Sequence, residues 1–455
     1  MNDGNASLER ILKLVDNGSF VEIGAKVTFR STDFPSSLSE ADGDGVRTGY
    51  GLVGGKPVYV YSQDASVLGG SVGEMHARKI ADLYRRAVST GQPVIGIIDS
   101  CGLRLEEVTD GLNGYAEIFR AKAEASGIVP EIDLIFGNAG GAMAIAASLS
   151  DFVLMEEAKG ALFLHAPNTV DDVKPGGIDV SKAKFASEEA GTVDFAGTED
   201  EIIGKCRTLI GLLPCNYEED AMEECSDDLN RLTPELSGET DVRLIAEAIS
   251  DRGSFTELKA SYEPSVMTAF SKFDGVTAAV IGSALPTLTP GGLEKMAAFV
   301  RFADAYSIPI LSFVKGEGFS AAVEDEKRLL RSASSFVSSL SGATVPKIEV
   351  LLGNPTGAAY LVMGSKALGM DYVFALQNTK IRVMAPESAA KILGGEDLTE
   401  VARRFDEKQS VLQAAKRGYV DEIIDETELR KKVLMALEML FTKRTKAPER
   451  KHASK

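Results

Sequence analysis

Two stretches of the chain repeat each other and decide its fold: VPEIDLIFGNAGGA at residues 129–142 and VPKIEVLLGNPTGA at residues 345–358. Seven of their fourteen positions are identical. Each stretch has the pattern of a short apolar strand, a Gly-Asn turn and a run of small residues that opens a helix. Two copies of one strand–turn–helix unit within 455 residues indicate an internal duplication.

Further repeated segments occur in the same order in both halves. DNGSFVE at 16–22 matches DRGSFTE at 251–257, and Gly69-Gly70 matches Gly291-Gly292. The apolar runs PVIGIID and PILSFVK that follow are typical of strands buried on both faces of a sheet. The series predicts two related α/β domains, each alternating strands with helices. A polar segment with Pro and Gly near residues 232–241 places the domains at 1–235 and 236–455.

Charge and cysteine usage exclude several classes of protein. The formal net charge of −18 argues against a nucleic-acid partner, because phosphate binding is driven by Lys and Arg. The four cysteines form no C-x-x-C pair, so neither a zinc ribbon nor another metal site is expected. The start of the chain lacks the pattern of a secretory signal, and no apolar run reaches 18 residues. We therefore expect a cytoplasmic, soluble protein.

The repeated turns are the candidate chemical sites. The first backbone amides of a helix have no internal acceptor, and glycine lets a ligand atom approach them closely. Gly140 and Gly141 in the first half, and Gly357 with Ala358 in the second, are therefore candidate donors to a negatively charged oxygen. The alternative, that these small residues only permit close packing of strand against helix, stays open.

Side chains that perform acid–base or nucleophilic chemistry are scarce. The three histidines are His76, His165 and His452, and no G-x-S-x-G, P-loop or H-E-x-x-H motif is present. Glu106 and Glu107 are candidates for a general acid and base, although a solvated acidic turn is the plainer interpretation. The pattern favours anion stabilisation by backbone amides, with the proton handled by the substrate or a cofactor.

Longer stretches carry a resemblance to a known family. They include GVRTGYG at 45–51, GGSVGEMHARKI at 69–80, DSCGLR at 99–104 and FVRFADAYSIPI at 299–310. With the two repeated turns, these stretches resemble the carboxyltransferases of biotin-dependent enzymes. That family includes the β subunits of propionyl- and acetyl-CoA carboxylases, the transcarboxylase core and the carboxyltransferase subunits of sodium-pumping decarboxylases. The resemblance covers nearly the whole chain.

The resemblance implies a fold and a division of labour. Each half would be a crotonase-like (ClpP/crotonase) spiral domain. The N-terminal half would bind the coenzyme A thioester, and the C-terminal half carboxybiotin, at a dimer interface within a hexamer. Gly140 and Gly141 would hold the thioester oxygen and stabilise the enolate. Gly357, Ala358 and Ala359 would hold the ureido oxygen of biotin, whose nitrogen would take the α-proton.

The resemblance also implies which residues contact the substrates. They are Gly69, Gly70, Cys101, Gly102, Arg104, Ala142 and Leu361. The sequence departs from the family pattern at several of these positions. Cys101-Gly102-Leu103-Arg104 replaces the usual Gly-Gly-Ala-Arg, and Thr356-Gly357-Ala358 replaces Tyr-Gly-Gly. Leu361 stands where propionyl-preferring members tend to carry an acid.

The partners follow from what the sequence lacks. It contains no Ala-Met-Lys-Met biotinylation motif and no ATP-grasp region. Biotin would therefore arrive on a separate biotin carboxyl carrier protein, with a biotin carboxylase subunit or membrane decarboxylase subunits completing the complex. Three alternatives stay open: the reverse, decarboxylating direction; a crotonase-like hydratase or isomerase with Glu106 or Glu107 as base; and a non-catalytic scaffold paralogue.

Overall fold

The chain forms two compact units, Met1–Glu219 and Asp220–Lys455. The computed structural model describes residues 6–30, 34, 43–166, 169–170, 179–225, 227–395, 397–443 and 445. Residues 220–235, which the sequence analysis assigned to the first half, belong to the second unit. The Thr277 amide donates to the Ala221 carbonyl and the Glu223 amide to the Gly275 carbonyl, so this segment runs along the edge of the second unit's β-hairpin.

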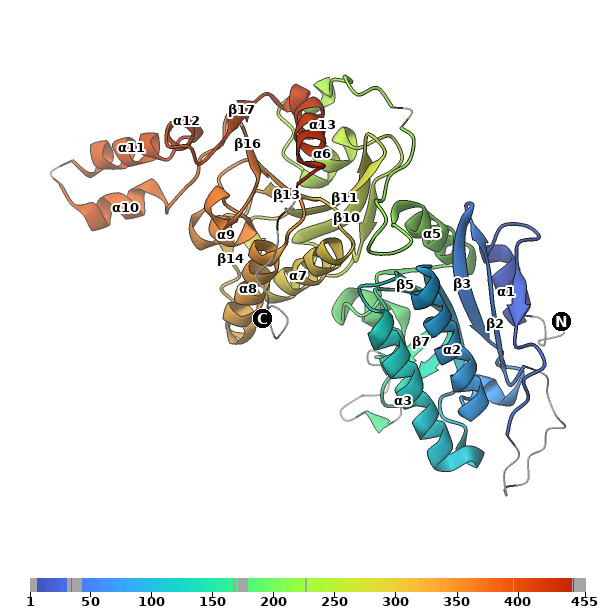
Figure 1. Cartoon of the computed structure of the whole chain (residues 1–455). Helices are drawn as coiled ribbons and strands as arrows, with labels where there is room; N and C mark the ends of the chain where they lie inside the picture. The colour runs from blue at the N-terminus through green and yellow to red at the C-terminus, as the bar shows by residue number, and fades with distance from the viewer. Residues whose placement is uncertain are drawn as a thin grey trace. The chain divides into compact units, whose positions relative to one another are not determined.

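The first unit is built on a mixed sheet in the order β1-β2-β3-β4-β5-β6-β8, with β7 paired to β5 beyond the main path (Figure 1). The strands from β1 to β3 are antiparallel, and the remaining pairings are parallel. The strands are β1 Val21–Ile23, β2 Val46–Val53, β3 Lys56–Gln63, β4 Val94–Ser100, β5 Glu131–Gly140, β6 Phe152–Glu156, β7 Ala161–Phe163 and β8 Phe195–Gly197.

The second unit repeats this order, as β9-β10-β11-β13-β15-β16-β17. Its first three strands are again antiparallel and the others parallel. The strands are β9 Thr256–Leu258, β10 Val266–Phe273, β11 Val276–Ser283, β13 Ile310–Val314, β15 Lys347–Leu351, β16 Tyr372–Leu376 and β17 Glu422–Ile424, with a separate pair of β12 Thr287–Leu288 and β14 Gly318–Phe319. The predicted internal duplication is confirmed by the shared strand order.

Helices cover both faces of each sheet (Figure 1). In the first unit α2, α3 and α4 pack on one face, and α1 and α5 on the other. In the second unit α6 and α13 share an apolar core on one face, and α7, α8 and α9 cover the other. The helices are α1 Ala6–Leu14, α2 Glu74–Thr90, α3 Val108–Ala125, α4 Ala142–Ser148, α5 Glu199–Leu212, α6 Val242–Ile249, α7 Pro290–Ala305, α8 Val323–Gly342, α9 Gly357–Met363 and α13 Leu429–Leu440.

A helical hairpin extends the second unit between β16 and β17 (Figure 1). It consists of α10 (Pro386–Leu393) and α11 (Leu398–Lys408), and the short α12 (Val411–Ala415) follows it. No residue of α11 is buried among those that the structure describes. Ile392 and Leu393 on α10 are 74% and 64% exposed.

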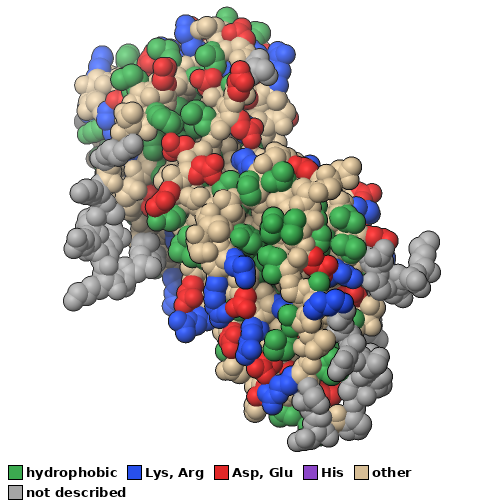
Figure 2. All heavy atoms as spheres, turned by 45° about the vertical axis from the view of Figure 1, so that its right-hand side comes forward, with side chains coloured by type: hydrophobic (Ala, Val, Ile, Leu, Met, Phe, Trp, Pro, Cys, Tyr) green, Lys and Arg blue, Asp and Glu red, His purple; other side chains and the backbone are tan. Residues whose placement is uncertain are grey.

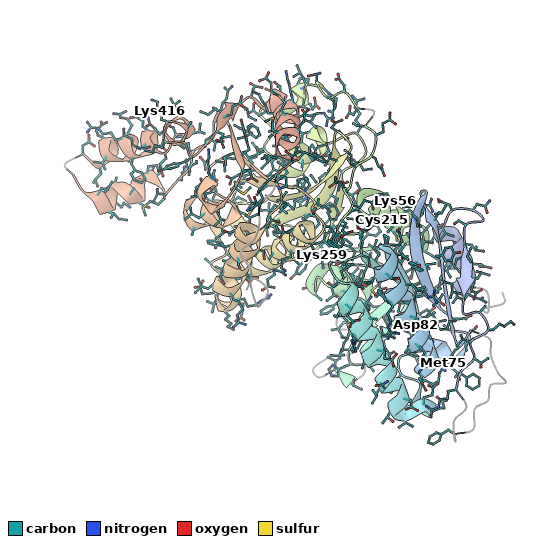
Figure 3. All side chains as sticks on the ribbon, viewed as in Figure 1. Lys56, Met75, Asp82, Cys215, Lys259 and Lys416 are labelled. Carbon is teal, nitrogen blue, oxygen red and sulfur yellow. The ribbon has the colours of Figure 1, made fainter. Side chains whose placement is uncertain are left out.

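The two β-hairpins are closed by turns that the sequence specifies. Gly54 and Gly55 join β2 to β3 with φ of 57° and 81°, and Asp274 and Gly275 join β10 to β11 with φ of 53° and 73°. Positive φ at both central residues defines the type I′ turn, which matches the twist of paired strands. The following strand is held at its start in the first unit, because Lys56 donates to the carbonyls of Gly211 and Leu213 (Figure 3).

A buried lysine occupies the same place in both units. Lys79 on α2 donates to the carbonyls of Gly43 and Val46, at the entry to β2. Lys295 on α7 donates to the carbonyls of Lys259, Tyr262 and Val266, at the entry to β10. Burial lowers the pKa of each lysine to about 8. Each ammonium group ties a helix to the turn that precedes the sheet's first long strand.

Charged side chains of both signs are interspersed with apolar ones on the face shown in Figure 2. Of the helices that the structure describes, none is long and apolar enough to cross a membrane.

Candidate functional site

Three turns of the first unit meet at the carboxyl ends of β4 and β5. Ser100 at the end of β4 lies beside Ala139 of β5, and a Cβ on Gly102 would lie 3.5 Å from the Gly140 carbonyl oxygen. The short 3-10 helix η2 (Leu68–Gly70) lies against β4, because the Cys101 amide donates to the Gly69 carbonyl over 2.9 Å. The structure thus brings together the predicted residues of Gly69-Gly70, Cys101-Gly102 and Gly140-Gly141-Ala142.

Glycine is required at two of these positions, at Gly70 by close approach and at Gly141 by its backbone conformation. A Cβ on Gly70 would lie 2.2 Å from the Asp99 carbonyl oxygen, well inside van der Waals contact. Gly141 has φ of 58° and ψ of −123°, a conformation that a side chain disfavours. The space beside it is open, since a Cβ on Gly141 would have no neighbour within 4 Å. A ligand atom can therefore reach the backbone at this turn.

The amides that remain free lie just after Gly141. The Gly141 amide itself donates to the Phe163 carbonyl of β7 over 2.9 Å. Among the residues that the structure describes, the next two amides, those of Ala142 and Met143, have no backbone acceptor. Two adjacent N–H groups beside an open glycine can stabilise an oxyanion.

The second unit reproduces this arrangement. Gly357 has φ of 55°, and its amide donates to the Arg382 carbonyl over 2.8 Å. Within the described part of the second unit, the amides of Ala358 and Ala359 again have no backbone acceptor. The turn after β13 lies alongside, because the Thr356 amide donates to the Gly316 carbonyl over 3.1 Å. Leu361, one helical turn further along α9, is 55% exposed.

Arg104 lies beneath the first-unit turns and is only 2% exposed. Its Nη1 lies 2.5 Å from Oδ1 of Asp44 and 3.0 Å from Oε1 of Glu107, and its Nη2 donates to the Ser71 carbonyl. Burial raises the pKa of the Asp44 carboxyl, and Arg104 opposes that shift. These contacts hold the loop that carries Cys101 in place.

Glu107 is engaged in the same network. Besides its contact with Arg104, its second carboxylate oxygen accepts the amide of Glu74 at the start of α2, over 2.5 Å. Its side chain is 1% exposed. A general base needs access to the substrate, so this geometry favours a structural role for Glu107 over the proton-abstracting role that a hydratase would require.

Cys101 and Tyr115 carry the thiol and the phenol of this region. The Cys101 thiol is exposed and lies 3.7 Å from the Leu68 carbonyl oxygen. Tyr115 on α3 is 2% exposed, and its hydroxyl makes no hydrogen bond with the described residues. Burial raises the pKa of both groups above their ordinary values, so each is a neutral group at pH 7.

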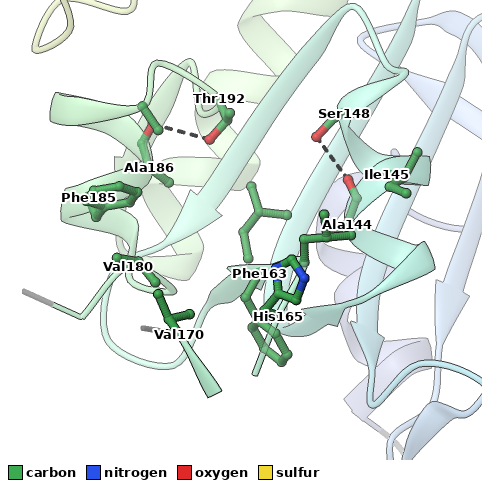
Figure 4. A pocket seen from close by; sticks show the side chains of 13 residues that line it. Ala144, Ile145, Ser148, Phe163, His165, Val170, Val180, Phe185, Ala186 and Thr192 are labelled. Atoms are coloured by element: carbon green, nitrogen blue, oxygen red, sulfur yellow. Dashed lines mark hydrogen bonds between the residues drawn. The ribbon is translucent and has the colours of Figure 1, made fainter. Parts of the chain in front are cut away.

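The histidines have distinct places. His76 is fully buried, with its ring nitrogens 3.0 Å from the Asp44 carbonyl and 3.1 Å from Nε2 of Gln63. Burial lowers the pKa of His76 well below its ordinary value. His165, by contrast, is exposed and lines a cavity of about 420 Å³ beside α4 (Figure 4). His452 lies outside the described residues.

Sequence reasoning missed two contributors to the site. The carbonyls of Phe163 and Arg382 occupy the amides of Gly141 and Gly357, and neither acceptor can be recognised from spacing along the chain. The weak available signal was the apolar run 161–164 before His165, which marks a short strand in the same sheet. As for metals, no cluster of three His, Cys, Asp or Glu side chains occurs in the part of the chain that the structure describes.

Comparisons with known proteins identify the family of the chain. Residues 3–454 match the carboxyl transferase domain family. The chain is 36% identical to methylmalonyl-CoA decarboxylase subunit alpha of Veillonella parvula, over 98% of this chain and 92% of that protein. It is 34% identical to the propionyl-CoA carboxylase beta chain of Saccharopolyspora erythraea, over 98% and 89% of the two chains.

A solved structure shares the whole fold. The transcarboxylase 12S hexamer core, with methylmalonyl-coenzyme A and methylmalonic acid bound, superposes with a TM-score of 0.93 at 32% sequence identity. The match covers 98% of this chain and 92% of that one. The family and the crotonase-like double fold predicted from the sequence are thereby confirmed. The chain belongs to the carboxyl transferase domain family and is a carboxyltransferase subunit of the acyl-CoA carboxylase and decarboxylase type.

Proposed function

We propose that the chain moves a carboxyl group between carboxybiotin and the α-carbon of a short acyl-CoA, such as acetyl- or propionyl-CoA. The observation that carries the proposal is the duplicated pair of free amides, Ala142 with Met143 and Ala358 with Ala359. Carboxyl transfer develops negative charge on two oxygens, one on the thioester and one on the urea of biotin. Two preformed donor pairs match that need.

The first unit takes the thioester in this proposal. The turn Gly140-Gly141 admits its carbonyl oxygen, and the amides of Ala142 and Met143 donate to it as the enolate forms. The backbone beside the thioester is that of Gly69, Gly70 and Gly102, and the Cys101 side chain lies next to it. Arg104 acts as a positioning residue, because its guanidinium is buried among protein partners.

The second unit takes the biotin. Gly357 leaves room for the ureido oxygen, to which Ala358 and Ala359 donate, and Leu361 borders the site from α9. Bound there, carboxybiotin would supply the carboxyl group and a ureido nitrogen that is basic enough for the α-proton. That chemistry needs no side-chain base, in keeping with the buried, engaged Glu107 and His76.

A second candidate is the reverse reaction, decarboxylation of a malonyl-type CoA as part of a membrane sodium pump. The 36% identity to a methylmalonyl-CoA decarboxylase alpha subunit favours it. In either direction the proposed partners are a biotin carboxyl carrier protein, with biotin carboxylase or membrane decarboxylase subunits. The transcarboxylase relative is a hexamer that forms a multienzyme core, and we propose a dimer-based hexamer here.

Proline substitution tests the free amides directly. Ala142→Pro and Ala358→Pro each delete one N–H in the first turn of a helix, where the fixed φ of proline is tolerated. We expect each to lower biotin-dependent decarboxylation of malonyl-CoA or methylmalonyl-CoA about 100- to 1,000-fold, with little change in melting temperature. Val323→Pro, at the exposed first position of α8, is the matched control and should keep the wild-type rate.

Two results would count against the proposal. Wild-type rates in both Ala142→Pro and Ala358→Pro would exclude these amides as the oxyanion donors. A folded wild-type protein that binds coenzyme A but decarboxylates neither substrate, with free biotin or a biotinylated carrier present, would favour the scaffold role.

A further inference from the structure

The first unit contains an apolar cavity that the proposed chemistry does not use. Its volume is about 420 Å³, and it lies between α4, β7 and the π-helix η5 (Phe185–Glu189) (Figure 4). Ala144 and Ile145 line it from α4, and Phe163 and His165 from β7 and the residues that follow. Cavities of about 300–1,000 Å³ are the usual size of small-molecule sites.

Most of the described lining residues are apolar. Among the described residues that line the cavity there is no Asp, Glu, Lys or Arg. The hydroxyls of Ser148 and Thr192 donate to the carbonyls of Ala144 and Ala186, so they are already satisfied within the protein. The described lining is thus mainly apolar, with His165 as a polar group at its edge.

The cavity adjoins the turn proposed to hold the thioester, since Ala144 and Phe163 line it and both contact that turn. Phe163 joins them: its ring lies against Gly140, where a Cβ would come within 2.8 Å of the ring, and its carbonyl accepts the Gly141 amide. On the α4 side, the Ala144 amide donates to the Gly141 carbonyl. A group that leaves the turn along α4 therefore enters apolar surroundings within one helical turn.

We propose that this cavity holds the acyl chain of the CoA thioester, and that it accepts chains longer than propionyl. The inference rests on the proposed function, because it takes the thioester carbonyl to sit at the Gly140-Gly141 turn. Acetyl and propionyl groups, with two and three carbons, fill only a small part of a cavity of about 420 Å³. Large apolar side chains at its rim, Ile145 at 44% and Leu164 at 57% exposed, remain to be covered by the ligand.

Binding of a CoA series to the isolated chain tests the proposal without requiring turnover. Isothermal titration calorimetry with free CoA and with acetyl-, propionyl-, butyryl- and hexanoyl-CoA gives the dissociation constants. Each methylene buried in an apolar site strengthens binding about fourfold, so hexanoyl-CoA should bind up to about 60-fold more tightly than propionyl-CoA. Free CoA sets the baseline for the contribution of the nucleotide and pantetheine parts.

A cavity-filling variant and its control make the test specific. Ala190→Phe adds a ring at an exposed lining residue, and should reduce the gain from propionyl- to hexanoyl-CoA to less than about fivefold while leaving free CoA binding unchanged. Ala123→Phe adds the same ring on the exposed face of α3, outside the cavity, and should keep the full gain.

The outcomes separate this inference from the proposed function. Equal affinities across the acyl series in the wild type, or an undiminished gain in Ala190→Phe, would overturn the cavity assignment and leave the carboxyltransferase site intact. Failure of the folded wild type to bind CoA or any thioester would overturn the proposed CoA site, and this inference with it.

Discussion

Replacing Glu349 by methionine should stabilise the protein, and more so as the pH rises. Glu349 on β15 is fully buried, and neither of its carboxyl oxygens has a hydrogen-bond partner among the described residues. Asp133 occupies the same position of the repeat in the first unit, but it contacts the Tyr61 hydroxyl, the Lys122 ammonium and the Ser150 hydroxyl at 3.0, 3.2 and 2.8 Å. The second unit has kept the carboxyl without its partners.

Glu349 lacks the tyrosine partner because another residue type occupies the equivalent position in the second unit. Both hairpins pair in the same register, Val46 with Gln63 and Val266 with Ser283, which aligns Tyr61 of the first hairpin with Ile281 of the second. A carboxyl in apolar surroundings keeps its proton, and burial raises the pKa of Glu349 well above its ordinary value.

The pH dependence follows from that shift. A group whose pKa is raised in the folded state contributes stability that is complete below its unfolded pKa, near about 4.3, and is lost as the pH rises toward the folded pKa. The loss is at most about 1.4 kcal/mol per pH unit, or up to about 2.7 kcal/mol between pH 5 and pH 7. Removing an unpartnered polar group from the interior adds a pH-independent gain of about 1–3 kcal/mol.

Urea denaturation of wild type and Glu349→Met at pH 5, 6 and 7 measures this gain. Far-UV circular dichroism is the suitable signal, because the chain contains no tryptophan. Where the two units unfold separately, the second unit's transition is compared. Methionine matches the unbranched shape of glutamate and fills apolar sites well.

Asp133→Leu is the matched control and should behave in the opposite way. It leaves the buried Lys122 with one carboxylate partner fewer, and should cost about 3–5 kcal/mol. A Glu349→Met protein that is less stable than wild type at pH 7, or a stability difference that does not grow from pH 5 to pH 7, would refute the reasoning about Glu349.

Three further substitutions test the framework of the first unit by the same urea titration. Arg104→Met leaves Asp44 and Glu107 buried without their cation and should cost about 3–5 kcal/mol, so a loss below 1 kcal/mol would argue against the ion-pair network. Gly141→Ala meets no atom within 4 Å but must adopt φ of 58° with ψ of −123°, and should cost about 1–3 kcal/mol; an unchanged midpoint would contradict the strained turn. Thr198→Ala removes the capping box of α5 and should cost about 1 kcal/mol, whereas Thr198→Ser should cost little.

Much of the fold was predictable because the two halves of the chain can be compared with each other. The repeated stretches at 129–142 and 345–358 became β5 with α4 and β15 with α9, in sheets of the same strand order. The Gly-Gly and Asp-Gly turns of the two hairpins also carry a local signal, which the predictions above did not use. The segment 220–235 was harder to place, because its packing on β11 depends on contacts far along the chain.

The site was predictable as a turn but not at the level of individual donors. Spacing indicated Gly140, Gly141 and Gly357; Gly141 and Gly357 adopt positive φ at the turns, whereas Gly140 ends β5 against the Phe163 ring. Which amides stay free depends on the carbonyls of Phe163 and Arg382, which reach the turns through tertiary pairing. Arg104 shows the same limit, since its partner Asp44 lies 60 residues away and no local pattern announces that pair.

The equivalent buried lysines Lys79 and Lys295 indicate which features of the chain are older than its duplication. A trait that both halves inherited was present in the single ancestral gene, so the ammonium group that fastens each helix to the sheet entrance is older than the fusion. Among the described residues, Glu349 has no counterpart of the Tyr61 and Lys122 contacts with Asp133, which means that these contacts were gained or lost after the copies diverged. Comparison of the two halves of this chain thus orders these changes relative to the duplication, without sequences of relatives.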